Sequence, residues 1–174
     1  MKLIIAISGA SGVSLGVKFI KYLPKEIEKF VVFTESAKVV LAKEEKLNIL
    51  NDSDISASIA SGSFRADSMA IIPCSMNTLA KISIGIADNL TTRSASVMIK
   101  EKKKLLIAPR EMPISSIHIE NMLKLSNMGV IISPPMLGYY ANIQTLEDME
   151  KFIIGKWYDS LEIEHNLFNR WGIL

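Results

Sequence analysis

Short apolar runs recur along this chain, and they alternate with longer segments whose apolar residues are spaced as on one face of a helix. The runs are continuous and rich in β-branched residues, which is typical of strands buried on both faces. Strands that alternate with helices are joined by right-handed crossovers and pair as a parallel sheet. The predicted strands span 3–7, 30–33, 69–72, 105–108 and 130–132. The predicted helices span 13–21, 36–46, 78–86, 90–100, 114–127 and 146–161.

This pattern predicts an α/β fold, a three-layer Rossmann-like or flavodoxin-like sandwich with helices on both faces of a parallel sheet. At 174 residues the chain is long enough for one domain and too short for two of ordinary size. Its tail, 162–174, carries Phe168, Arg170 and Trp171 and is too apolar to lie free in water. We therefore expect a single domain over 1–174 whose tail packs at a subunit contact.

The composition argues against several classes of partner. A net charge of +2 gives no general attraction to nucleic acid, and no apolar stretch approaches the roughly 18 residues that span a membrane. The one basic cluster, 100–104, is typical of the solvated end of a helix. Cys74 is the only cysteine, so no intrachain disulfide forms and a cytoplasmic location is expected. His118 and His165 are far apart in the sequence and have no cysteine near them, so the sequence shows no His/Cys spacing typical of a metal site.

In a parallel sheet the carboxyl ends of the strands meet at one edge, and ligands bind there near the point where the strand order reverses. The rule selects the segments that follow the predicted strands. These segments are 8–12, 34–36, 73–78, 109–113 and 133–140. We expect them to face one cleft.

The first of these segments contains Gly9, Ala10, Ser11 and Gly12. Backbone N–H groups and the positive end of the following helix can hold a phosphate at such a turn. The spacing G-x-x-G-x-x-x-G matches neither the dinucleotide nor the P-loop fingerprint. A tight turn also needs glycine without any ligand, so this segment alone leaves a purely structural role open. Glu35, after the second predicted strand, keeps nicotinamide binding open as well.

Two further segments carry more polar side chains than the predicted secondary structure requires. In "PCSMNTLAKI", 73–82, Ser75, Asn77 and Thr78 crowd a predicted helix start at which capping requires only one such residue. They favour a ligand with several acceptors, such as a phosphate or the edge of a heterocycle. Arg110 and Glu111 follow the fourth predicted strand, where a cation binds phosphate and a carboxylate transfers a proton. As an isolated pair, they are equally consistent with a surface salt bridge.

Several motifs in one order resemble the flavin prenyltransferase family, known as UbiX or Pad1, within the flavin-binding Cys-decarboxylase superfamily. They cover nearly the whole chain. The motifs are "ISGASG", "SGSF" at 61–64, "PCSMNTLAKI", "DNLTTRSASVMIKE" at 88–101, "REMPISSIHIENM" at 110–122, "SPPMLGYY" at 133–140 and "FNRWG" at 168–172.

The resemblance implies an enzyme that transfers a dimethylallyl group from dimethylallyl monophosphate to N5 and C6 of reduced FMN. FMN is then a substrate as much as a cofactor, and the family needs no metal. The product, prenylated FMN, serves partner decarboxylases of the UbiD type. The resemblance also implies a homo-oligomer, usually a dodecamer, with active sites at subunit contacts.

By the same resemblance, three sets of residues form the site. FMN is held by Gly9, Ala10, Ser11, Thr34, Ser75, Met76, Asn77, Thr78 and Arg110. The allylic phosphate is held by Tyr140 and Lys156. Further active-site positions are Glu44, Arg93, Lys100, Glu111 and Trp171. The family commonly has Ser in place of Thr34 and Arg in place of Lys156, and both departures keep the chemical type.

These residue types suit the implied reaction. Breaking an allylic C–O bond develops a carbocation and a phosphate, so cations such as Arg93, Lys100 and Lys156 are expected around the departing oxygens. The face of Trp171 stabilises a cation, and Glu111 is expected to move a proton. Three alternatives stay open. They are an FMN-dependent cysteinyl decarboxylase, a non-catalytic flavin- or nucleotide-binding accessory protein, and a nicotinamide oxidoreductase.

Overall fold

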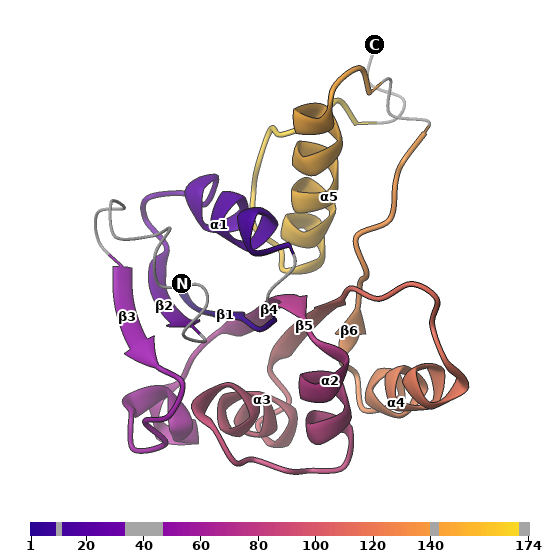
Figure 1. Ribbon diagram of the computed structural model, residues 1–174. Coiled ribbons are helices and arrows are strands. Elements are labelled where there is room, and N and C mark those ends of the chain that lie inside the picture. Colours follow the sequence, from indigo (N-terminus) through magenta and orange to yellow (C-terminus); the bar gives the residue numbers. More distant parts are fainter. Residues whose placement is uncertain (10–11, 34–46, 140–142, 171–174) are drawn as a thin grey trace.

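Six strands form one parallel sheet in the residues that the computed structural model describes, 1–9, 12–33, 47–139 and 143–170 (Figure 1). The strands are β1 Lys2–Ile7, β2 Glu28–Phe33, β3 Leu47–Asn51, β4 Ser68–Cys74, β5 Lys104–Pro109 and β6 Ile131–Ile132. Their order in the sheet is β3-β2-β1-β4-β5-β6, and neighbouring strands are parallel. The order reverses between β1 and β4, so the binding edge predicted from the sequence lies at their carboxyl ends.

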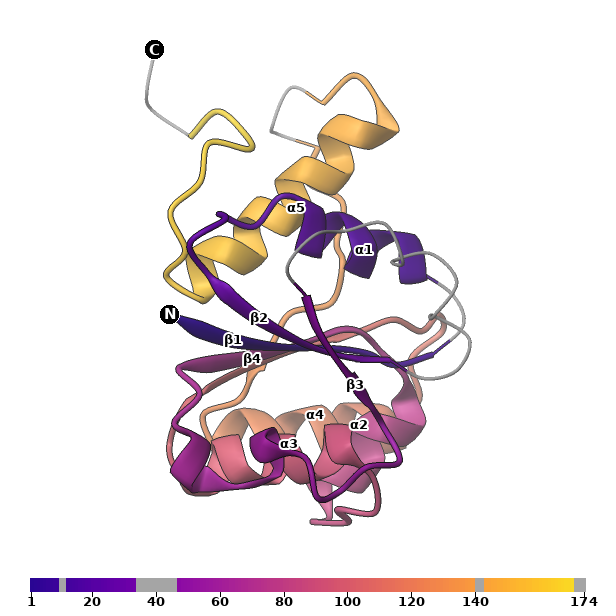
Figure 2. The ribbon, with the colours of Figure 1, turned by 90° about the vertical axis from the view of Figure 1, so that its left-hand side faces the viewer.

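Helices cover both faces of this sheet, as the side view in Figure 2 shows. On one face lie α1 (Val13–Lys21) and α5 (Leu146–Ser160). On the other lie α2 (Met76–Ser83), α3 (Leu90–Lys100) and α4 (Ser116–Asn127), with the short 3-10 turns η2 (Ser58–Ala60) and η3 (Gly62–Phe64). The predicted three-layer α/β sandwich is confirmed. Among the described residues, no helix is both long and apolar enough to cross a bilayer.

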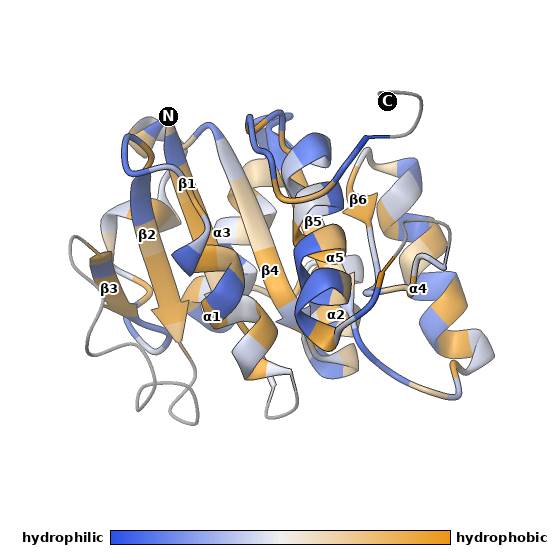
Figure 3. Ribbon diagram, turned by 90° about the horizontal axis from the view of Figure 1, so that it is seen from above, coloured by the Kyte–Doolittle hydropathy of each residue, from blue (hydrophilic) through white to orange (hydrophobic). Residues whose placement is uncertain are grey.

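The core consists of two apolar layers, one on each face of the sheet. Alternate residues of β1 point into different layers: Ile5 and Ile7 pack with Trp157 under α1 and α5, whereas Ile4 and Ala6 pack on the opposite side. Because all of these side chains are buried, β1 has the continuous apolar sequence expected of a central parallel strand. Figure 3 shows apolar residues toward the carboxyl end of β2 and along most of β4.

One strand was missed by the sequence pattern. β3 has the sequence LNILN, with asparagine at two of its five positions and Ile49 about half exposed. It pairs with β2 alone and forms an edge of the sheet, so it lacks the continuous apolar run of the central strands. The helix predicted over 36–46 lies outside the described residues.

Two helices differ from their predicted bounds because capping residues set their starts. α2 begins at Met76, after Ser75 accepts a hydrogen bond from the Thr78 N–H, and it ends before Gly85, whose φ is +78°. α4 begins at Ser116 because Ser115 caps it in the same way. The predicted starts, 78 and 114, were each wrong by two residues.

Candidate active site

The turn after β1 lies at the switch point of the sheet. Gly9 and Gly12 have φ values of +103° and +87°, a left-handed backbone that residues with a Cβ rarely adopt. The N–H of Ser8 donates to the carbonyl oxygen of Pro73 over 3.1 Å, which ties this turn to the end of β4. Gly12 is also the N-cap of α1, so the positive end of that helix faces the turn.

Helix α1 is held unusually close to the sheet. A Cβ built on Gly16 would lie 3.0 Å from Cδ1 of Ile7 and closer still to the carbonyl oxygen of Ile72. Only glycine permits this approach. The packing therefore fixes the start of α1 beside the carboxyl ends of β1 and β4.

Three hydroxyl groups converge beside the turn. Ser8 Oγ lies 2.8 Å from Thr78 Oγ1 and 3.3 Å from Ser75 Oγ, and Ser75 donates to Thr78 over 3.0 Å. The N–H of Ser75 donates to Ser8 Oγ over 3.2 Å. We call Ser8, Ser75 and Thr78 the hydroxyl cluster. Ser8, which is only 4% exposed, lies in the segment 8–12 predicted to face the cleft, but only Ser75 and Thr78 were predicted as site residues.

Arg110 approaches the same turn from β5. Its N–H donates to the carbonyl oxygen of Cys74 over 3.3 Å, which places it beside the end of β4. A Cβ on Gly12 would lie 3.4 Å from Cδ of Arg110, so the arginine side chain runs along the glycine turn. Glu111 is exposed next to it, and its Oε1 accepts a hydrogen bond from the N–H of Met112 over 3.1 Å.

The other predicted residues of this stretch occupy different environments. Met76 is partly buried against the apolar layer under α2, whereas Asn77 is exposed at the start of that helix. Cys74 is buried, and burial raises the pKa of its thiol well above the ordinary value. A thiol held in this neutral form is a poor nucleophile, so Cys74 is a structural residue.

Three predicted cations are held on other elements of the same chain. Arg93 on α3 donates from Nε to the carbonyl oxygen of Ala60 over 3.2 Å. Lys100, the last residue of α3, pairs with Glu101 over 2.7 Å. Lys156 is exposed on α5, where its Nζ lies 3.9 Å from Oδ2 of Asp159.

A single chain thus assembles only part of the predicted site. Gly9, Ser75, Thr78 and Arg110 come together at the switch point, with Glu111 adjacent. Six other predicted residues lie outside the described residues: Ala10, Ser11, Thr34, Glu44, Tyr140 and Trp171.

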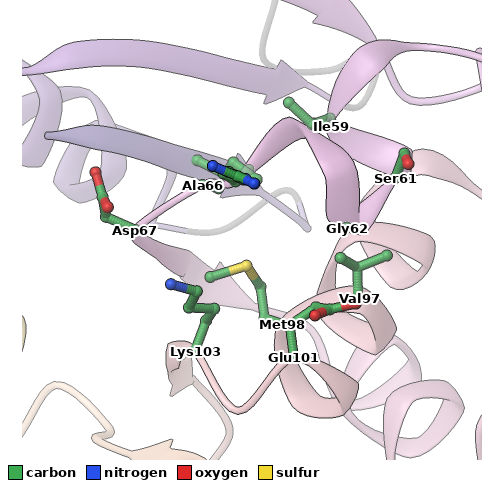
Figure 4. Close-up of a pocket in the computed structure, with 11 residues that line it drawn as sticks. Ile59, Ser61, Gly62, Ala66, Asp67, Val97, Met98, Glu101 and Lys103 are labelled. Atoms are coloured by element: carbon green, nitrogen blue, oxygen red, sulfur yellow. The ribbon is translucent and has the colours of Figure 1, made fainter.

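A hollow of about 410 Å³ lies at the opposite edge of the sheet, near the amino ends of the strands (Figure 4). Val97 and Met98 give it an apolar wall, and Asp67, Glu101 and Lys103 give it charge. Asp67 accepts the N–H of Lys2 over 2.6 Å and Glu101 pairs with Lys100, so both carboxylates already have partners. None of the predicted site residues lines this hollow. Across the described ranges, no three His, Cys, Asp or Glu side chains gather as metal ligands do.

Known proteins resemble this chain over its full length. The family described as Flavoprotein matches residues 1–158. The flavin prenyltransferase UbiX of Helicobacter pylori strain 26695 is 52% identical, over 99% of this chain and all of the relative.

Solved structures agree with the sequence relatives. The dodecameric FMN-dependent UbiX-like decarboxylase of Escherichia coli O157:H7 is 40% identical with a TM-score of 0.90, covering 98% of this chain and 99% of that one. AnUbiX (PadA1), solved with FMN and dimethylallyl pyrophosphate, is 34% identical with a TM-score of 0.90, covering 99% of this chain and 98% of that one.

Proposed function

We propose that this chain, which belongs to the UbiX family of flavin prenyltransferases, joins a dimethylallyl group to reduced FMN. Dimethylallyl monophosphate supplies the group, which bonds to N5 and C6 of the flavin and closes a fourth ring. The allylic C–O bond breaks and phosphate leaves with the electron pair; N5 and C6 each lose a proton, and the allylic double bond gains one. The product, prenylated FMN, is the cofactor of UbiD-type decarboxylases, the proposed recipients.

The convergence at the switch point is the observation that carries this function. Gly12 caps the start of α1, whose positive end faces the turn after β1, and the side chain of Arg110 lies against Gly12. This donor set fits the phosphate of FMN. The hydroxyl cluster adds groups that donate or accept, as a ribityl chain or the edge of a flavin ring requires.

The leaving phosphate needs further positive charge. In the proposal Lys156 and Tyr140 bind it, and Arg93 and Lys100 stabilise the charge that develops as the C–O bond breaks. Because Arg93, Lys100 and Lys156 each contact a group outside the hydroxyl cluster, we infer that neighbouring subunits complete each site. Glu111 stands next to Arg110 and is proposed to move the proton, with released phosphate as a second base. Trp171 is proposed to stabilise the allylic cation with its ring.

The surface of α4 supports the inferred oligomer. Ile117, Ile119 and Leu123 are exposed on this helix, and Met112 is exposed just before it. Ile119 and Leu123 are four residues apart and therefore lie on one face of the helix, and exposed apolar side chains that gather in this way mark interaction surfaces. We infer that a second copy of the chain covers them, and the dodecameric relative supports this occupant.

Light scattering of matched variants tests that surface. Leu123→Lys and Ile55→Lys each replace an apolar residue that is 59% exposed, but only Leu123 lies on α4. We expect Leu123→Lys to reduce the mass of the oligomer and Ile55→Lys to leave it unchanged. An unchanged mass in both variants would show that the α4 surface is not a subunit contact.

The reaction itself is tested by mass spectrometry of the flavin. After incubation with reduced FMN and dimethylallyl monophosphate, we expect a flavin heavier by one five-carbon unit. Arg110→Gln should lose most of this product, whereas Arg65→Gln, an exposed arginine near the opposite edge, should retain it. Unchanged flavin would contradict prenyl transfer. Release of carbon dioxide from a cysteinyl peptide would favour the decarboxylase alternative, and flavin binding without either reaction the accessory protein.

Two further parts of the proposal concern the setting of the enzyme. A cytoplasmic location is supported by the single Cys74, because a lone cysteine forms no intrachain disulfide. We also propose, from the family, that the reaction needs no metal. The cationic side chains would stabilise the leaving phosphate, as magnesium does in other phosphate chemistry.

A further inference from the structure

Helix α5 holds the two segments that lead into Tyr140 and Trp171. The loop before Tyr140 rests on Phe152, since a Cβ on Gly138 would lie only 2.7 Å from Cζ of that ring. The tail before Trp171 rests on the same side chain, because the rings of Phe152 and Phe168 have centroids 5.1 Å apart. Both segments are therefore packed against one residue of α5.

The tail also lies directly on the helix backbone one turn further along. A Cβ on Gly155 would be 2.5 Å from Cε1 of Phe168 and 2.7 Å from Cε1 of His165. Glycine at this position lets both rings reach α5. The side chains of His165 and Phe168 thus pack on their own chain, and the predicted contact of the tail with another subunit stays a prediction.

Asp159 fixes the end of this tail by charge. Arg170 donates from both terminal nitrogens to the carboxylate, over 2.8 Å to Oδ1 and 3.3 Å to Oδ2. His165, whose side chain is 3% exposed, lies 3.1 Å from Oδ1, and its Nδ1 accepts the N–H of Leu167 over 3.1 Å. We call Asp159, His165 and Arg170 the tail clamp.

The tail clamp also affects the charge partner of Lys156, which lies one turn earlier on α5. Its Nζ is 3.9 Å from Oδ2 of Asp159, a longer approach than either bond from Arg170. Partial burial raises the pKa of Asp159, but the bonds from Arg170 and His165 outweigh it and keep the pKa below the ordinary value. The carboxylate is therefore charged and satisfied by Arg170, which leaves Lys156 only weakly engaged.

We propose that Asp159 and Arg170 are positioning residues that hold the tail to α5 and keep Lys156 available for the phosphate of the allylic substrate. The inference rests on the proposed function, because it takes Lys156 as a phosphate ligand. Neither positioning residue needs to touch the substrate.

Replacement of Arg170 and replacement of Asp159 are expected to change substrate binding to different extents. Arg170→Gln frees the tail and leaves the Asp159 carboxylate without its arginine, so Lys156 becomes its main cationic partner. Asp159→Asn frees the tail too, but removes the carboxylate that competes for Lys156. We expect the KM for dimethylallyl monophosphate to rise by up to about fivefold in Arg170→Gln and less in Asp159→Asn. The affinity for FMN should stay unchanged in both.

Hydrogen exchange supplies a readout independent of activity. Peptides covering 161–170 should exchange faster in both variants, because the N–H of Leu167 loses its fixed acceptor on His165. Arg170→Lys, which keeps the charge without the two-pronged geometry, should lie between wild type and Arg170→Gln. Glu164→Gln, an exposed carboxylate of the same tail, is the matched control and should change neither exchange nor KM.

The outcomes separate this inference from the proposed function. Unchanged exchange in Asp159→Asn and Arg170→Gln would show that the clamp does not hold the tail. Faster exchange with an unchanged KM, or a larger rise in KM for Asp159→Asn than for Arg170→Gln, would refute the effect on Lys156. A wild-type protein that binds FMN but forms no prenylated product would refute the proposed function, and the exchange measurement would still test the clamp.

Discussion

Replacement of Gly16 by alanine should loosen the packing that positions the phosphate turn. The new Cβ would lie 3.0 Å from Cδ1 of Ile7, whereas ordinary contact begins at 3.4 Å, so α1 must retreat by at least the 0.4 Å between them. The carbonyl oxygen of Ile72 is closer still and, as backbone, cannot rotate away. Overpacking of this kind lowers the free energy of unfolding by about 1–3 kcal/mol, and the better helix propensity of alanine offsets about 1 kcal/mol of that loss.

We therefore expect Gly16→Ala to destabilise the protein by up to about 2 kcal/mol, which lowers the Tm by about 4–8 °C for a chain of this size. The affinity for FMN should fall further than stability alone requires, because α1 carries the glycine turn at its start. Loss of one charge-assisted hydrogen bond to the phosphate, about 1.5–3 kcal/mol, corresponds to roughly a tenfold to hundredfold higher Kd.

Calorimetry and titration of flavin fluorescence measure the two effects separately. Ser14→Ala, at an exposed position of the same helix, is the control and should leave the Kd for FMN unchanged. If Gly16→Ala melts at the wild-type Tm and binds FMN as tightly, the close approach of α1 to β4 does not position the site.

Three further predictions concern single residues. Ser75→Ala and Ser115→Ala each remove a helix cap and should cost about 1 kcal/mol, but only Ser75→Ala should weaken FMN binding. Cys74 should react with a thiol reagent only after unfolding, because burial raises its pKa; rapid labelling of the native protein would contradict this. The low pKa of Asp159 means that tail protection in hydrogen exchange should persist from neutral pH down to about 4 and be lost only below the ordinary value of 3.8; loss already near pH 6 would contradict the clamp. The groups that face Asp159 are Lys156, His165 and Arg170.

The sequence predicted the central strands and the binding edge well, because those features depend on local pattern. β1 is apolar at every buried position, and Ser75 stands where a helix start needs a cap. The edge strand β3 escaped prediction because it pairs with a neighbour on one side only and three of its five residues are exposed, so it needs no continuous apolar run. Ser8 was overlooked because its role depends on Ser75 and Thr78, which are about 70 residues away and meet it only in the folded chain.

The cationic residues and the tail show a second limit of prediction from the sequence. Arg93, Lys100 and Lys156 were grouped by the resemblance of the sequence to a family, but the chain places the first two on α3 and the third on α5, each with a partner of its own. The apolar character of the tail predicted that it packs at a subunit contact, and that contact stays a prediction. The contacts of Phe168 with Phe152 and Gly155 assign its described part to α5 of the same chain, which no local pattern indicates.

A crystal structure with FMN and dimethylallyl monophosphate bound tests the central claim most directly. The account predicts the flavin phosphate at the turn between Gly9 and Gly12 beside Arg110, the hydroxyl cluster against the flavin, and Lys156 from another subunit at the allylic phosphate. A flavin bound instead in the hollow beside Glu101, or an Arg110 side chain pointing away from it into solvent, would contradict the account.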